Sequence, residues 1–65
     1  MIPEKDWLMW EAMRKYGGSF VKALAEALAH ADSDNYSKLE QAFPEYFAEY
    51  RELGKNKSNE FLSTN

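Results

Sequence analysis

Apolar residues recur along the chain with the period of an α-helix, in stretches separated by short polar or glycine-containing breaks. The first stretch follows Pro3, a residue suited to a first helical position, and it ends at Tyr16. Gly17 follows, and we expect it to take the left-handed conformation that often closes a helix. Ser19 suits the N-cap of a second helix, which is predicted to run from Phe20 to about residue 31.

The second half of the chain predicts one more helix and a short fourth segment. Residues 32–35 are all short polar residues that break a helix and cap the next, so the third helix is expected to begin between Asp32 and Ser37. Pro44 is expected to break this helix and to start a fourth segment over residues 45–53, closed by Gly54. The polar residues 55–65 are predicted to form a flexible tail, and whether Phe61 and Leu62 dock is left open.

The predicted fold class is therefore all-α: a small bundle of three helices, the third broken at Pro44 into a short fourth helix. Valine, isoleucine and threonine total three residues, and no segment alternates with period two, so a sheet is not expected. The predicted domain spans residues 1–54. The second helix is apolar over most of its circumference, which predicts that it is the central element.

Spacing residues at about 100° per position predicts the buried face of each helix. The expected inward residues are Met9, Ala12, Met13 and Tyr16, then Phe20, Leu24, Ala27, Leu28 and Ala31, then Tyr36, Leu39 and Phe43, and last Tyr46, Phe47, Tyr50 and Leu53. Trp7 falls on the opposite side of the first helix, between Glu11 and Arg14. A tryptophan among charges indicates either a contact surface or a position covered by the tail.

Composition narrows the classes of function. The chain has no cysteine, which excludes disulfides and thiolate metal sites. Eleven acidic and eight basic residues give a net charge of −3, which disfavours broad binding to nucleic acid or to anionic membranes. No long apolar run or signal-peptide pattern is present, so we expect a cytoplasmic protein without membrane or nucleic-acid partners.

Catalytic chemistry has little support in the sequence. The single histidine, His30, lies with Glu26 on a polar stripe, and two ligands on one helix leave a metal site incomplete. The serines that could act as nucleophiles, Ser19, Ser33 and Ser37, are better explained as helix caps. We therefore expect no enzyme activity, no metal and no cofactor.

Two surfaces each have a functional and a purely structural interpretation. Gly17, Gly18 and Ser19, followed by Lys22, could bind an anion at a helix start, or could only separate two helices. Glu45, Glu49 and Glu52 line one face of the fourth segment. That face could imitate the charge of DNA, or it could be an ordinary solvated face.

Protein–protein contact is the remaining class. The chain has two tryptophans, four tyrosines and four phenylalanines, and tryptophan, tyrosine and arginine are frequent interface anchors. The predicted interface residues are Trp7, Trp10, Arg14, Glu45, Glu49 and Glu52, with Tyr46 and Tyr50 as further candidates. Self-association is a second possibility, because it would stabilise a chain this short.

A resemblance adds a biological setting. The segments that carry it are residues 17–27 (GGSFVKALAEA), Ala31-Asp32, Leu39, residues 42–47 (AFPEYF) and Tyr50. This pattern, over roughly residues 7–51, resembles small helical proteins encoded by bacteriophages and prophages, a group without an established activity. Phe47 stands where that pattern has tryptophan, which is a conservative change. The resemblance implies a phage accessory protein in a bacterial cytoplasm.

We therefore expect a non-enzymatic module that inhibits or modulates a bacterial host protein by covering one of its surfaces, with defence proteins as one class of target. One alternative is a small anion- or nucleotide-binding protein that uses Gly17, Gly18, Ser19 and Lys22. The other is a structural module that assembles with copies of itself.

Overall fold

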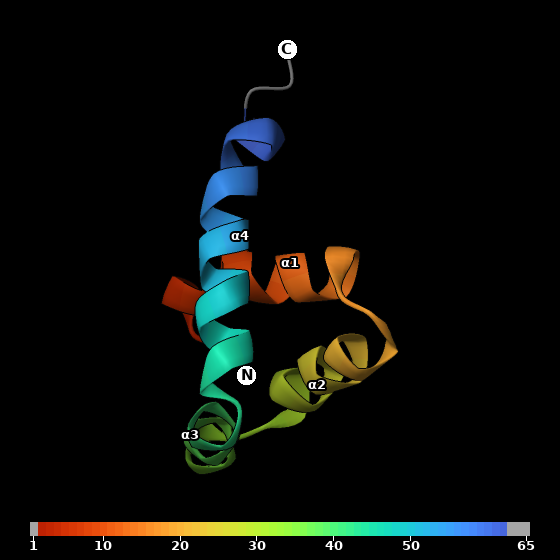
Figure 1. Cartoon of the computed structure of the whole chain (residues 1–65). Helices are drawn as coiled ribbons and strands as arrows, with labels where there is room; N and C mark the ends of the chain where they lie inside the picture. Colours follow the sequence, from red (N-terminus) through yellow and green to blue (C-terminus); the bar gives the residue numbers. More distant parts are fainter. Residues whose placement is uncertain (1, 63–65) are drawn as a thin grey trace.

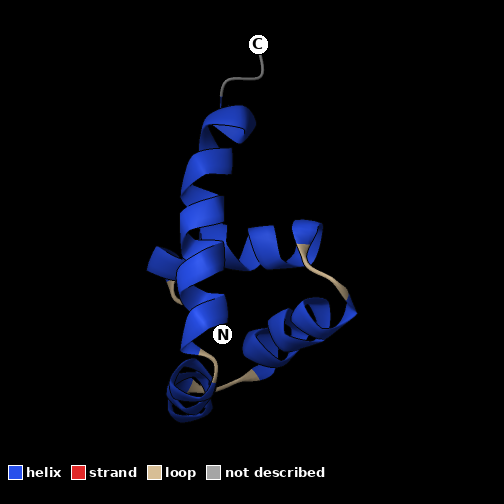
Figure 2. Cartoon of the chain, viewed as in Figure 1, coloured by secondary structure: helices blue, strands red, loops and turns tan. Residues whose placement is uncertain are grey.

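A computed structural model describes residues 2–62 of the chain, and side chains over residues 2–57. A 3₁₀ turn, η1 (Glu4–Asp6), leads into four α-helices: α1 (Trp7–Tyr16), α2 (Ser19–His30), α3 (Ser33–Ala42) and α4 (Pro44–Leu62). Residues 2–62 contain no strand (Figure 2), which confirms the all-α prediction.

The longest helix, α4, crosses α1 near the middle of its own length (Figure 1). Helix α2 packs against α1, and α3 lies beside the first turns of α4. Lys57 of α4 still reaches the Tyr16 ring of α1, and the end of α4 extends beyond the other helices (Figure 1). The molecule measures 38 × 22 × 17 Å. Helix α1 packs against both α2 and α4 and so takes the central position that was predicted for the second helix, while Phe20 of α2 also contacts the Tyr46 ring of α4.

Apolar residues from all four helices form one core. Its buried members are Met9, Ala12, Met13, Val21, Leu24, Ala25, Leu28, Ala31, Tyr36, Phe47 and Tyr50. Most of the inward positions were predicted from helical spacing. Three were wrong, because Tyr16, Phe20 and Ala27 are exposed. The buried face of α2 is centred on Val21, Ala25 and Leu28, so its orientation is rotated from the predicted one.

Gly54 lies inside α4, at the crossing with α1. The predicted helix end at Gly54 is wrong, because α4 continues through this residue to Leu62. A Cβ atom on Gly54 would lie 2.5 Å from the carbonyl oxygen of Leu8. Glycine is thus required because the backbones of α4 and α1 almost touch here, a role that glycine fills at close helix crossings.

The turn between α1 and α2 also differs from its prediction. Gly17 has φ −75° and ψ 155°, which is extended rather than left-handed. A Cβ there would lie 2.5 Å from the Cγ1 atom of Val21, so packing explains this glycine too. The N-cap of α2 is Gly18 rather than Ser19.

Asp32 and Pro44 mark where α3 and α4 begin. The Asp32 carboxylate accepts a hydrogen bond from the backbone N–H of Asn35 at 2.8 Å, which places the start of α3 within the predicted window. Pro44 is the first residue of α4, where its missing N–H costs nothing. The predicted short fourth helix is wrong, since α4 has 19 residues.

The predicted tail overlaps the last part of α4, whose backbone is helical to Leu62. Docking of the Phe61 and Leu62 side chains lies outside the described residues. Among residues 2–62, none of the helices combines the length and the hydrophobicity required to span a membrane.

Candidate functional site

Three of the predicted interface residues meet on the outer side of α1, and we call Trp7, Trp10 and Arg14 the tryptophan face. The ring centroids of Trp7 and Trp10 are 4.9 Å apart, with the planes tilted by 46°. The Arg14 guanidinium lies 4.6 Å from the centroid of the Trp10 ring, a cation–π distance. Arg14 also forms an ion pair with Glu11, at 3.7 Å. Helical spacing produces this stack, because residues three and four positions apart lie on one side of a helix.

Trp10 anchors the tryptophan face to the rest of the fold. Its indole N–H donates a hydrogen bond of 2.9 Å to the backbone carbonyl of Ala25 in α2. The Trp10 ring is half-buried, whereas Trp7 keeps 48% of its surface exposed and Leu8 keeps 41%. Trp7 therefore rests on an anchored aromatic ring and presents its outer surface to solvent.

Lys22, predicted as an anion ligand, lies in a hollow beside the tryptophan face. This hollow of about 480 Å³ between α1 and α2 is lined by Trp10, Arg14, Lys22, Glu26, Ala29 and His30, and we call it the basic hollow. Gly17 does not contribute a free donor to an anion site. Its N–H donates to the carbonyl of Met13 at 3.0 Å, and the residue is buried. Gly18 and Ser19 are exposed at the start of α2.

The remaining predicted interface residues, Glu45, Glu49 and Glu52, are exposed along α4. Neither the basic hollow nor the hollow beside Trp7 includes any of them. The structure thus brings together the tryptophans, Arg14 and Lys22, and places the glutamates on a separate surface. Burial raises the pKa of the neighbouring Tyr50 phenol, and the charge of Glu49 raises it further.

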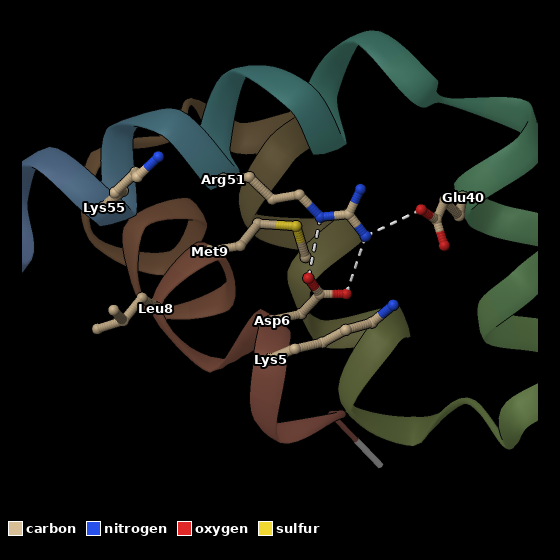
Figure 3. A pocket seen from close by; sticks show the side chains of 7 residues that line it. All are labelled: Lys5, Asp6, Leu8, Met9, Glu40, Arg51 and Lys55. Carbon is tan, nitrogen blue, oxygen red and sulfur yellow. Dashed lines mark hydrogen bonds and ion pairs between the residues drawn. The ribbon is translucent and has the colours of Figure 1, made fainter.

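A second group of polar residues, absent from the sequence analysis, joins the first, third and fourth helices. Asp6, at the start of α1, is only 2% exposed. Its carboxylate accepts hydrogen bonds from the Tyr36 hydroxyl at 2.8 Å and from the Arg51 guanidinium at 2.9 and 3.1 Å. Arg51 also donates to Glu40 at 2.9 Å. We call Asp6, Tyr36, Glu40 and Arg51 the Asp6 cluster; Figure 3 shows Arg51 between the two carboxylates.

The pKa values within the Asp6 cluster follow from its contacts. Burial alone would raise the pKa of Asp6, but hydrogen bonds from Arg51 and Tyr36, with the charge of Arg51, lower it below the usual 3.8. Burial raises the pKa of the Tyr36 phenol, and its hydrogen bond to Asp6 raises it further. The bond to Asp6 also raises the pKa of Arg51. Asp6 is thus held ionised, and Tyr36 and Arg51 are held protonated.

The sequence carries one local signal of this cluster. Arg51 is four residues after Phe47, so the two share a helix face, and the guanidinium lies 5.4 Å from the Phe47 ring. That spacing places Arg51 at the edge of the core. Its acceptor Asp6 is 45 residues away, a distance that helical spacing cannot bridge.

The chemistry of the Asp6 cluster favours a structural role. An aspartate with a lowered pKa and three hydrogen-bond donors is a weak base. Among the side chains described, no buried polar atom lacks a hydrogen-bond partner. An open hollow of about 500 Å³ beside the cluster is lined by Lys5, Asp6, Leu8, Met9, Glu40, Arg51 and Lys55 (Figure 3). The described residues contain no group of three or more acidic or histidine side chains placed to hold a metal.

Comparison with protein-family models, with curated proteins and with solved structures finds no match to the chain.

Proposed function

We propose that this chain is a non-enzymatic protein-binding module and that the tryptophan face is its contact surface. The observation that supports this proposal is the exposure of Trp7, at 48%, beside the exposed Leu8 on the side of α1 away from the core. Large aromatic side chains dominate binding energy in protein interfaces when they become buried there. Trp7 has this large apolar surface to bury, and the fold does not bury it.

The support beneath Trp7 strengthens the proposal. Trp10 is held in place by its hydrogen bond to Ala25, and Arg14 lies over the same ring. A contact residue that is already ordered loses less conformational entropy on binding. Tryptophan and arginine are also the residue types most enriched among the dominant contacts of interfaces.

The proposed partner is a bacterial host protein, in line with the resemblance to phage and prophage proteins. A small protein of 65 residues can act on such a protein by covering one of its surfaces. The proposed outcome is inhibition or modulation of that protein, with defence proteins as one class of target.

The test is a quantitative pull-down from bacterial lysate with three tagged forms of the chain. The forms are the wild type, Trp7→Ala, and Phe20→Ala as the matched control, since Phe20 is an aromatic residue on α2 with 51% of its surface exposed. We expect one protein captured in near-equal amount by the wild type and by Phe20→Ala, and lost with Trp7→Ala.

Circular dichroism of all three forms separates binding from folding. Trp7→Ala removes the contact with the Trp10 ring, worth about 0.5–1.5 kcal/mol, together with the apolar surface that the half-exposed Trp7 already buries, so we expect a lower stability in a domain that stays folded. Equal capture by wild type and Trp7→Ala would contradict the proposal. Recovery of a differently tagged copy of the chain alone would instead identify a self-assembling module.

A further inference from the structure

The basic hollow continues the tryptophan face around α1. Trp10 and Arg14 belong to both surfaces, and Trp7 packs on Trp10 at 4.9 Å. A partner that covers Trp7 can therefore reach into the hollow without crossing another element.

The charge of the hollow favours a negatively charged group. Arg14 and Lys22 approach it from two helices, and His30 adds an imidazole at the other end of α2. Glu26 is the one acidic residue among its lining residues. Within residues 2–57, Lys22 forms no ion pair, so its ammonium group can take a carboxylate from outside.

The floor of the hollow favours a carboxylate that is carried on an apolar segment. The half-buried Trp10 ring forms part of the wall, and Ala29 adds further apolar surface. The Trp10 indole N–H is already bonded to Ala25 and the Arg14 guanidinium lies over the ring, so the part of the ring left open beside Arg14 offers apolar surface rather than a free hydrogen-bond donor. An inorganic anion would use the cations and leave this surface uncovered.

We infer that the partner contributes a segment with an aspartate or glutamate next to an apolar side chain, the carboxylate bound by Arg14 and Lys22 and the apolar group packed on Trp7 and Trp10. This inference rests on the proposed function and specifies the chemistry of its partner. Glu45, Glu49 and Glu52 do not line this hollow.

The test is to immobilise the full chain and to select the peptides that bind it from a displayed library of random dodecapeptides. We expect the enriched peptides to share an aspartate or glutamate beside an aromatic or aliphatic residue. Binding of the synthesised peptides can be followed by tryptophan emission, because both tryptophans of the chain belong to the tryptophan face.

Charge-reversal variants identify the ligating groups. We expect Lys22→Glu and Arg14→Glu each to weaken peptide binding by at least about tenfold, since each replaces an attractive contact with a repulsive one. The matched control is Lys38→Glu on α3, an exposed lysine paired with Asp34 and absent from the hollow, which should change binding less than about twofold. Circular dichroism of each variant is the control for folding, and we expect all three to remain folded.

Three results would overturn the inference. The first is that the selection enriches no peptide, or only peptides without acidic residues. The second is unchanged peptide binding to Lys22→Glu. The third is complete displacement of the peptide by 10 mM inorganic phosphate, which would identify a simple anion site. Capture of a partner that depends on Trp7 but not on Lys22 would leave the proposed function standing while removing this inference.

Discussion

Replacement of Asp6 by asparagine tests the Asp6 cluster most directly. Asparagine has nearly the same size, and Asp6 makes no side-chain capping bond at the start of α1, so capping and packing change little. The substitution removes the negative charge of the side chain and replaces one of its acceptor oxygens by an N–H donor group. The new amide group would direct N–H donors toward Tyr36 or Arg51, where the carboxylate now accepts hydrogen bonds.

The expected cost follows from burial. Removing one partner of a fully buried ion pair costs about 3–5 kcal/mol. Here Arg51 has 38% of its side chain exposed and retains its bond to Glu40, so part of that cost is relieved by solvent and by the second carboxylate. We therefore expect a loss of about 2 kcal/mol at pH 7, or about 8–16 °C in melting temperature for a domain of this size. The total free energy of unfolding of a chain of this length is about 3–10 kcal/mol, so a loss of about 2 kcal/mol is large.

The assay is thermal and urea unfolding followed by circular dichroism at 222 nm. Asp34→Asn is the matched control, because Asp34 is exposed and, within residues 2–57, its ion-pair partner is Lys38 at 3.4 Å. It should cost less than about 0.5 kcal/mol. Equal stability losses for Asp6→Asn and Asp34→Asn would refute the reasoning and show that the cluster contributes no net stability.

Acid provides an independent check on Asp6. Its pKa is lowered in the folded state, so its contribution is fully present above the usual value of 3.8 and is lost as the pH falls through the lower, folded value. The stability difference between wild type and Asp6→Asn should therefore shrink below about pH 4. A difference that stays constant to pH 2 would contradict ionisation of Asp6 as its cause.

The two remaining predictions concern the helix crossing and the phenol. Gly54→Ala should destabilise the fold by about 2 kcal/mol or more in urea unfolding, despite the better helix propensity of alanine, because its Cβ would lie 2.5 Å from the Leu8 carbonyl oxygen. The control is Gly18→Ala, which has open space around the new Cβ and should cost under about 1 kcal/mol. Equal losses of stability in the two variants would contradict a steric cause. Tyr36→Phe should cost about 1–2 kcal/mol of stability at pH 7, because the hydrogen bond to Asp6 is lost. Burial and Asp6 raise the pKa of Tyr36 in the folded state, so the wild type should lose stability as the pH rises above 10, and the variant should lose less. If the stability of the two forms fell in parallel above pH 10, this assignment would be contradicted.

The parts of the fold that depend on nearby residues could be predicted from the sequence. The helical period, the capping role of Asp32 and most inward positions involve residues within a few positions of each other. Trp7 was also predicted correctly as a residue outside the core, because its charged neighbours lie on the same side of α1.

The parts that failed depend on contacts between distant segments. Gly54 looks like a helix end unless the close approach of Leu8 is known. Asp6 looks like a residue that stabilises a helix start, because Tyr36 and Arg51 reach it from 30 and 45 positions away. The placement of Lys22 beside Arg14 likewise depends on how α2 packs on α1, which helical spacing does not determine.

The crossing of α1 and α4 affects how this protein folds while it is being made. Helix α1 is synthesised before α4, which it crosses, and α2 and α3 come between them. Until Phe47 and Arg51 have left the ribosome, Met9 and Met13 lack the Phe47 side of their core, and Asp6 lacks Arg51. The nascent chain therefore exposes Met9 and Met13, and a premature stop before Phe47 should yield a target for chaperones and proteases rather than a smaller folded domain.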